Sequence, residues 1–133
     1  MSLLIGIVLA LASAALARAA RFDRRTFYAV LVVVVGHYYV LFAAMAGSMR
    51  ATIIESLVMA AFVLLAGVGF RLNPWLIVGG LAAHGLLDVV HGQLISNPGV
   101  PAWWPPFCMA FDVAAAGVFA LSIARTPSAR SQP

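Results

Sequence analysis

The sequence contains no lysine, so all eight of its basic residues are arginines. This absence excludes a Schiff base to retinal or pyridoxal, a P-loop and a lysine nucleophile. Cysteine is nearly absent as well, because Cys108 is the single one. One cysteine forms neither an intramolecular disulfide nor a CxxC metal motif, and we expect it to be a packed, inert thiol. The residues left to carry chemistry are histidines and acids.

Charged residues are also scarce, at 9% of 133 residues, whereas hydrophobic residues make up 64%. Soluble domains have about 25% charged residues, so the composition predicts an integral membrane protein. The arginines stand singly or in short clusters beside apolar segments. We therefore interpret the positive net charge as a signal of membrane topology and expect no nucleic-acid partner.

Arg, Asn, Gly and Pro divide the chain into five apolar segments, and a helix needs about 20 such residues to cross a bilayer. The sequence thus predicts an all-α protein, a bundle of five transmembrane helices in a single domain over 1–125, followed by a disordered tail over 126–133. The helices are expected at about 2–20, 26–47, 50–70, 74–95 and 105–125.

The arginines also predict an orientation, because cytoplasmic loops collect basic residues. Seven of the eight fall on one side of the predicted bundle, and Arg50 falls on the other. The seven are Arg18, Arg21, Arg24, Arg25, Arg71, Arg125 and Arg130. This asymmetry favours an N-terminus outside and a C-terminus in the cytoplasm.

The longest connection, ISNPGVPAWWPP over 95–106, would then lie on the outer face. Its prolines disfavour helix and its tryptophans favour the membrane interface, so it is either an interfacial anchor or a lid over an outward-facing cavity. Stripes of Gly and Ala in the helices are typical of close helix packing in lipid. Those of the first or third segment are the candidate interface of a homodimer.

All three histidines and three of the four acids fall inside the predicted helices. They are His37, Glu55, His84, Asp88, His91 and Asp112. His84, Asp88 and His91 have the spacing i, i+4 and i+7, which places them on one helix face. Ionisable groups in a bilayer usually face the bundle interior and pair with one another. Counting the helical rise predicts that all six groups gather in the outer half of the membrane.

Histidines and carboxylates at one depth predict a buried metal site. We expect His37, His84, Asp88 and His91 to bind one or two zinc or iron ions, with Glu55 and Asp112 as general bases. Other roles stay open for three of these residues. His37 fits a packing role, Glu55 a place near the interface beside Arg50, and Asp112 a partner that orients a histidine.

The segments GLAAHGLLDVVHG and ISNPGVPAWWPPFCMAFDV resemble a family of small bacterial integral membrane proteins of unknown function, with the patterns HGxxDxxHG and NPGVPxWWPxFCxxFD. The resemblance implies a compact membrane bundle but no activity. We expect the protein to lie in the bacterial inner membrane. A looser similarity links the chain to the membrane hydrolases that include alkaline ceramidases and the progestin and adiponectin receptors. That similarity implies only the idea of an intramembrane metal site.

These features predict a metal-dependent membrane enzyme that acts on a lipid or another apolar small molecule. It would be a zinc hydrolase or an iron oxidase or hydroxylase. Three alternatives stay open: a proton or ion transporter, a haem protein with two histidine ligands, and a structural membrane subunit. Transport requires polar groups in both halves of the bundle, and the sequence places them in one.

Overall fold

The computed structural model describes residues 1–125, which form five α-helices and contain no strand. The helices are α1 (Ser2–Ala19), α2 (Arg24–Met45), α3 (Met49–Arg71), α4 (Trp75–Leu94) and α5 (Trp104–Ala124). Each bound lies within two residues of the prediction. The predicted tail over 126–133 lies outside the described residues.

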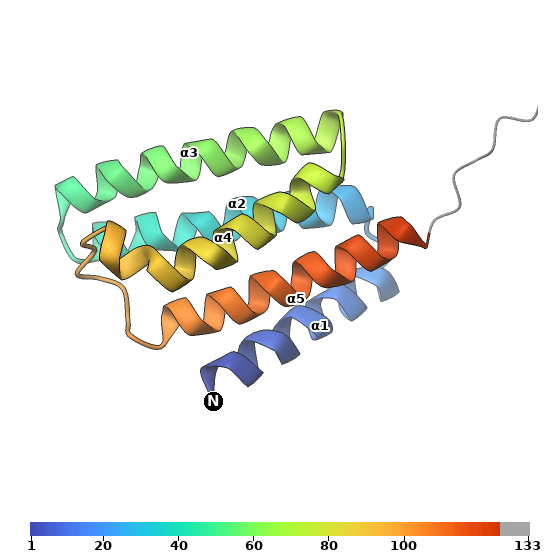
Figure 1. The fold of residues 1–133 in the computed structure, drawn as a ribbon, viewed down its shortest axis with the longest axis horizontal. Coiled ribbons are helices and arrows are strands. Elements are labelled where there is room, and N and C mark those ends of the chain that lie inside the picture. Colours follow the sequence, from blue (N-terminus) through green and yellow to red (C-terminus); the bar gives the residue numbers. More distant parts are fainter. Residues whose placement is uncertain (126–133) are drawn as a thin grey trace, which may run out of the picture.

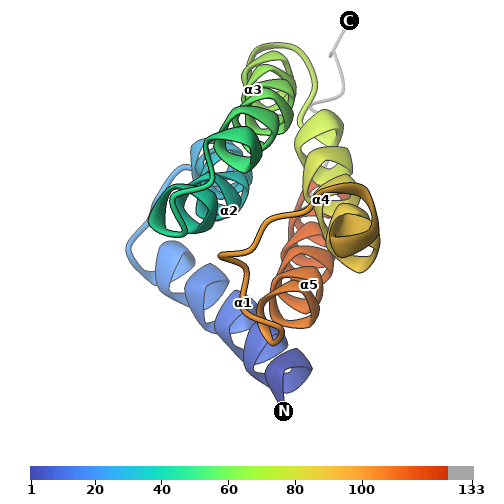
Figure 2. The ribbon, with the colours of Figure 1, turned by 90° about the vertical axis from the view of Figure 1, so that its left-hand side faces the viewer.

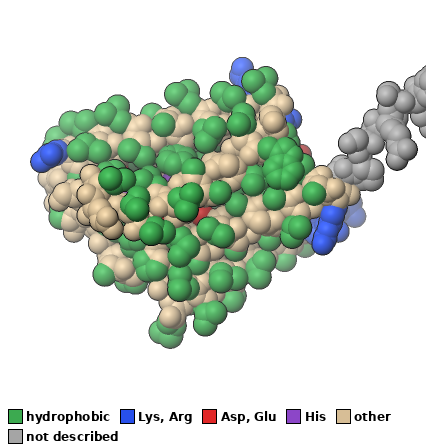
Figure 3. Space-filling view, in the orientation of Figure 1, with side chains coloured by type: hydrophobic (Ala, Val, Ile, Leu, Met, Phe, Trp, Pro, Cys, Tyr) green, Lys and Arg blue, Asp and Glu red, His purple; other side chains and the backbone are tan. Residues whose placement is uncertain are grey.

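Each of the five helices is long and apolar enough to cross a membrane, and the five lie side by side along one common direction (Figure 1). Hydrophobic side chains cover the visible face between the two ends, and arginine appears near those ends (Figure 3). Helices satisfy their own backbone hydrogen bonds, which lipid cannot do. The fold is therefore consistent with a multi-pass membrane protein.

Short polar side chains and proline set the starts of three helices. The carboxylate of Asp23 accepts hydrogen bonds from the backbone and hydroxyl of Thr26 at the start of α2, and these hydrogen bonds lower the pKa of Asp23. Ser48 caps α3 in the same way. Pro105 and Pro106 lie in the first turn of α5, where a missing backbone N–H is tolerated.

α5 packs between α1 and α4, and α2 packs mainly on α3, whereas α1 makes little contact with α2. The contact between α1 and α5 is close because Gly6 faces the backbone carbonyl of Phe107, where a Cβ has no room. Ala10 and Ala17 of α1 are also buried. Small residues of α1 thus serve the contact with α5, and the homodimer stays a prediction for α3.

The connection between α4 and α5 crosses the end of the bundle in the direction of α2 (Figure 2). Gly99 lies so close to the carbonyl of Phe42 in α2 that a Cβ at this position would overlap it. The side-chain amide of Asn97 donates to the backbone oxygen of Tyr39, also in α2, at 3.0 Å. The loop is therefore fixed to the neighbouring helix at two points.

We expect Gly99→Ala to destabilise the protein by about 2 kcal/mol, because the methyl group would displace the loop from α2. The control is Gly92→Ala, since a methyl group on the exposed Gly92 of α4 would meet no other atom within 4 Å. Alanine favours helix over glycine, so the control is expected to be neutral or slightly stabilising. Thermal unfolding in detergent measures both, and equal stability of the two variants would contradict the contact.

Candidate metal centre

Three ionisable residues of α4 form one buried stripe, as the spacing of i, i+4 and i+7 predicts. His84, Asp88 and His91 are each exposed by 2% or less. Asp112 of α5 and Glu55 of α3 are buried equally deeply. The structure therefore places five of the six predicted site residues in the interior, where they divide into two groups.

The first group, called here the His84 cluster, consists of His84, Asp88, Cys108 and Asp112. The imidazole Nδ1 of His84 lies 2.7 Å from Asp112 Oδ2 and 3.8 Å from Asp88 Oδ2. The thiol of Cys108 donates to Asp112 Oδ2 at 3.8 Å. One candidate ligand atom from each of the four residues lies within 4.8 Å of the other three. α4 and α5 alone supply these atoms.

Two carboxylate oxygens of this cluster lack a hydrogen-bond partner among the described residues. They are Asp88 Oδ2 and Asp112 Oδ1, and both are buried. The separation of 3.8 Å between His84 Nδ1 and Asp88 Oδ2 is too long for a hydrogen bond. A buried carboxylate oxygen without a partner is costly in an apolar interior. The cluster thus contains two buried carboxylate oxygens with unused acceptor capacity.

Tyr39 of α2 connects the two groups. Its hydroxyl donates to Asp88 Oδ1 at 2.6 Å, and its ring stacks on His91 with centroids 4.0 Å apart. Such a short hydrogen bond to a carboxylate fixes the orientation of the acid. Two tyrosines, Tyr38 and Tyr39, follow the candidate ligand His37 in the sequence, and Tyr39 is the one whose hydroxyl reaches the site.

The second group consists of Glu55, His91 and Asn97. Glu55 Oε1 lies 2.8 Å from His91 Nε2 and accepts a hydrogen bond of 2.8 Å from the Asn97 amide. These contacts join α3, α4 and the loop that follows α4. Glu55 therefore anchors the loop and pairs with His91, in place of a contact with the residues of the His84 cluster.

His37 is the predicted ligand that lies outside the buried groups formed by the other five site residues. It is exposed on α2, and its Nδ1 lies 3.2 Å from the sulfur of Met59. The reason is rotational, because residues two apart on a helix point to nearly opposite sides. Tyr39 faces inward, so His37 faces outward.

Two residues of the site were not predicted from the sequence. Cys108 is packed, as expected, but its thiol contacts Asp112 instead of apolar groups alone. Its spacing of four residues from Asp112 was an available signal. Asn97 lies in the loop, and only its place in the segment SNPG could have marked it as an anchor.

The candidate ligand atoms of the His84 cluster are close enough to one another that they could hold a metal ion. Metal–ligand bonds of about 2.0–2.3 Å place tetrahedral ligand atoms roughly 3.3–3.7 Å apart. The distance of 3.8 Å from His84 Nδ1 to Asp88 Oδ2 is close to this spacing. The shorter separation of 2.7 Å between His84 and Asp112 would widen as an ion replaced that hydrogen bond.

Comparison of the chain with protein-family models, with curated proteins and with solved structures finds no match. The geometry of the His84 cluster is therefore the basis on which its chemistry is inferred.

Proposed function

We propose that this protein binds one divalent metal ion in the His84 cluster and uses it to hydrolyse an ester or amide bond of a membrane lipid. The observation that carries the proposal is the pair of buried oxygens without partners, Asp88 Oδ2 and Asp112 Oδ1. With both carboxylates ionised, the group of Asp88, Asp112 and His84 carries a net negative charge even when His84 is protonated. A cation bound by both carboxylates would give Asp88 Oδ2 a partner and balance the charge.

The donor set favours a single zinc ion. A non-haem iron site typically needs two histidines and one carboxylate, whereas the His84 cluster holds one histidine. Di-iron bundles take carboxylates and histidines from four helices, whereas this cluster draws on two. Zinc accepts nitrogen, oxygen and sulfur ligands in a tetrahedral arrangement.

A catalytic zinc site has three protein ligands and one open position. We assign the three to His84, Asp88 and Asp112, which leaves the side of Cys108 open. Zinc lowers the pKa of a bound water to about 7. Asp112 has two carboxylate oxygens, so it can bind the ion through one and take the water proton through the other. The ion would supply an activated water for hydrolysis, and Asp112 would hold the proton that passes to the leaving alcohol or amine when the ester or amide bond breaks.

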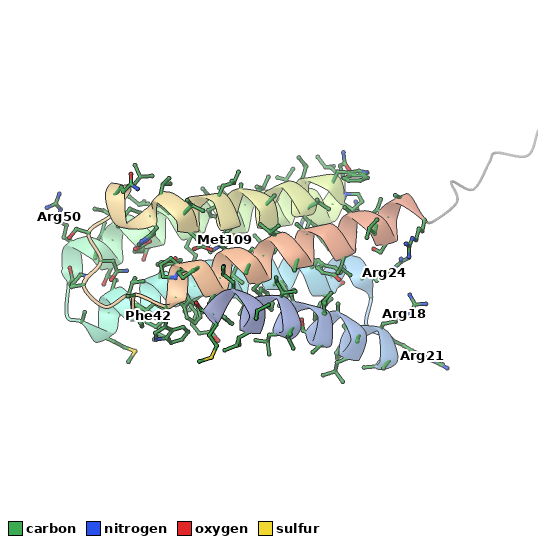
Figure 4. The ribbon with its side chains drawn as sticks, turned by 60° about the horizontal axis from the view of Figure 1, so that its bottom comes forward. Arg18, Arg21, Arg24, Phe42, Arg50 and Met109 are labelled. Atoms are coloured by element: carbon green, nitrogen blue, oxygen red, sulfur yellow. The ribbon has the colours of Figure 1, made fainter. Side chains whose placement is uncertain are left out.

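We propose further that the N-terminus lies outside, that the C-terminus is cytoplasmic and that the membrane is the bacterial inner membrane. Arg18, Arg21 and Arg24 lie at one end of the bundle, and Arg50 lies at the other (Figure 4). This distribution supports the orientation, because basic residues favour the cytoplasmic side. The His84 cluster would then open to the outer half of the bilayer.

Lipid turnover by the purified protein tests the proposal. The protein is reconstituted in nanodiscs of bacterial lipid extract with zinc, and mass spectrometry follows the release of fatty acid. We expect release to fall by at least about 100-fold in Asp112→Asn, since this variant loses a ligand and a base. Asp23→Asn is the matched control, because Asp23 is an exposed acid in the first connection. No release by zinc-loaded protein from any lipid of the extract would refute the hydrolase.

A further inference from the structure

An apolar cavity of about 220 Å³ lies between α1, α2 and α5, beside the His84 cluster. Its lining includes Leu9, Val34, Tyr38, Trp104, Cys108 and Phe111. We call it the lateral cavity. Leu9, Val34 and Tyr38 are also exposed on the sides of α1 and α2, where these helices make little contact. The cavity therefore lies along the flank that lipid chains would cover.

Cys108 belongs both to the lateral cavity and to the His84 cluster. Its side chain is 1% exposed, and its thiol contacts Asp112. A molecule in the cavity therefore meets the cluster at the side that the three assigned ligands leave open. No other described residue lines this cavity and also belongs to the cluster.

Trp104 supplies a polar feature in this apolar lining. It is 8% exposed, and its indole Nε1 is buried without a hydrogen-bond partner among residues 1–125. An indole N–H is a donor only, and a buried donor without an acceptor is unfavourable. Trp104 lies one helical turn before Cys108, so the two side chains are neighbours on one face of α5. The wall of the cavity next to the cluster thus contains a residue with one unused hydrogen-bond donor.

We propose that the lateral cavity binds the hydrocarbon chain of an uncharged acyl lipid, whose carbonyl oxygen accepts a hydrogen bond from Trp104. This inference rests on the proposed function and names the substrate class of the same site, an acyl ester or amide. The volume is below the roughly 300 Å³ of common small-molecule pockets, which suits one chain segment better than a fused ring system. The apolar lining disfavours a charged headgroup inside the cavity.

Photolabelling tests this site in the metal-bound protein. The probe is palmitamide with a diazirine in mid-chain and a terminal alkyne, added to protein in detergent. Leu9→Trp fills the cavity, and Leu11→Trp is the matched control on the same helix. The two leucines are equally exposed, at 50% and 49%, but Leu11 does not line the cavity. We expect labelled peptides from α5 in the parent and in Leu11→Trp, and at least about fivefold less label in Leu9→Trp.

The hydrogen bond is tested in the parent by competition with unlabelled ligands, which needs no cavity variant to fold. Palmitamide should compete about fivefold better than hexadecane, which lacks a carbonyl, and Trp104→Phe should abolish this difference. Equal labelling of Leu9→Trp and Leu11→Trp would overturn the site, and equal competition by the two ligands would overturn the carbonyl contact.

Metal content of the same samples separates this inference from the proposed function. If the protein binds zinc but Leu9→Trp is labelled as strongly as the parent, only the proposed acyl-chain site in the lateral cavity is refuted. If Leu9→Trp loses the label but the purified protein contains no metal, the proposed hydrolase is refuted and the acyl-chain site remains.

Discussion

The variant His84→Gln is expected to lose its bound metal, whereas His91→Gln is expected to keep it. Both glutamines carry an amide N–H donor, and in His91→Gln this donor lies near the position of the Nε2 that faces Glu55. Only the first change removes a ligand from the His84 cluster, because an amide is a poor ligand for zinc. Elemental analysis of the purified variants should give less than about a tenth of the wild-type metal for His84→Gln, since each lost ligand contact lowers affinity steeply.

The two histidines are matched controls for each other, since they lie on one helix and are equally buried. Gel filtration and thermal unfolding show whether both variants fold. Loss of metal from both variants would indicate one shared site of the kind that the sequence predicted. Retention of metal in His84→Gln would contradict the assignment of the His84 cluster.

The variant His91→Leu is expected to destabilise the protein by about 3–5 kcal/mol. Removal of the imidazole leaves the buried carboxylate of Glu55 with only the amide of Asn97. The double variant Glu55→Leu with His91→Leu removes both charges, so it should regain much of the lost stability. Unfolding of the three proteins in one detergent gives the comparison.

This result would identify the Glu55 and His91 pair as a structural anchor of the loop. If the double variant is as unstable as His91→Leu, the loss of stability comes from the packing of leucine at these positions and not from the unpaired charge of Glu55. Equal stability of His91→Leu and wild type would contradict the pairing itself.

The five helices were predictable because a membrane span requires a long apolar run, and such runs are visible in one sequence. The inward stripe of His84, Asp88 and His91 was predictable from spacing and from the cost of charge in lipid. The partners of these residues were not predictable in the same way. They depend on which helices flank α4, and apolar segments of similar length carry no signal for their neighbours.

The division into two groups follows from the length of the helix. His84 and His91 are seven residues apart, which is about 10.5 Å along the axis. At this separation the two imidazoles contact different neighbouring helices, so His84 meets Asp112 of α5 and His91 meets Glu55 of α3. His37 was misplaced because the run VVVVGHYYV is apolar on every side. Such a run gives no period to show which face of α2 is buried.

X-ray absorption spectroscopy of the metal in purified wild-type protein is the decisive experiment for the His84 cluster, since it reports the atoms bound to the ion. We predict one zinc ion per chain, with nitrogen and oxygen ligands at about 2.0–2.2 Å that include one imidazole. A folded protein without metal would contradict the site. A closed shell that includes sulfur at about 2.3 Å would make the ion structural and contradict the enzyme.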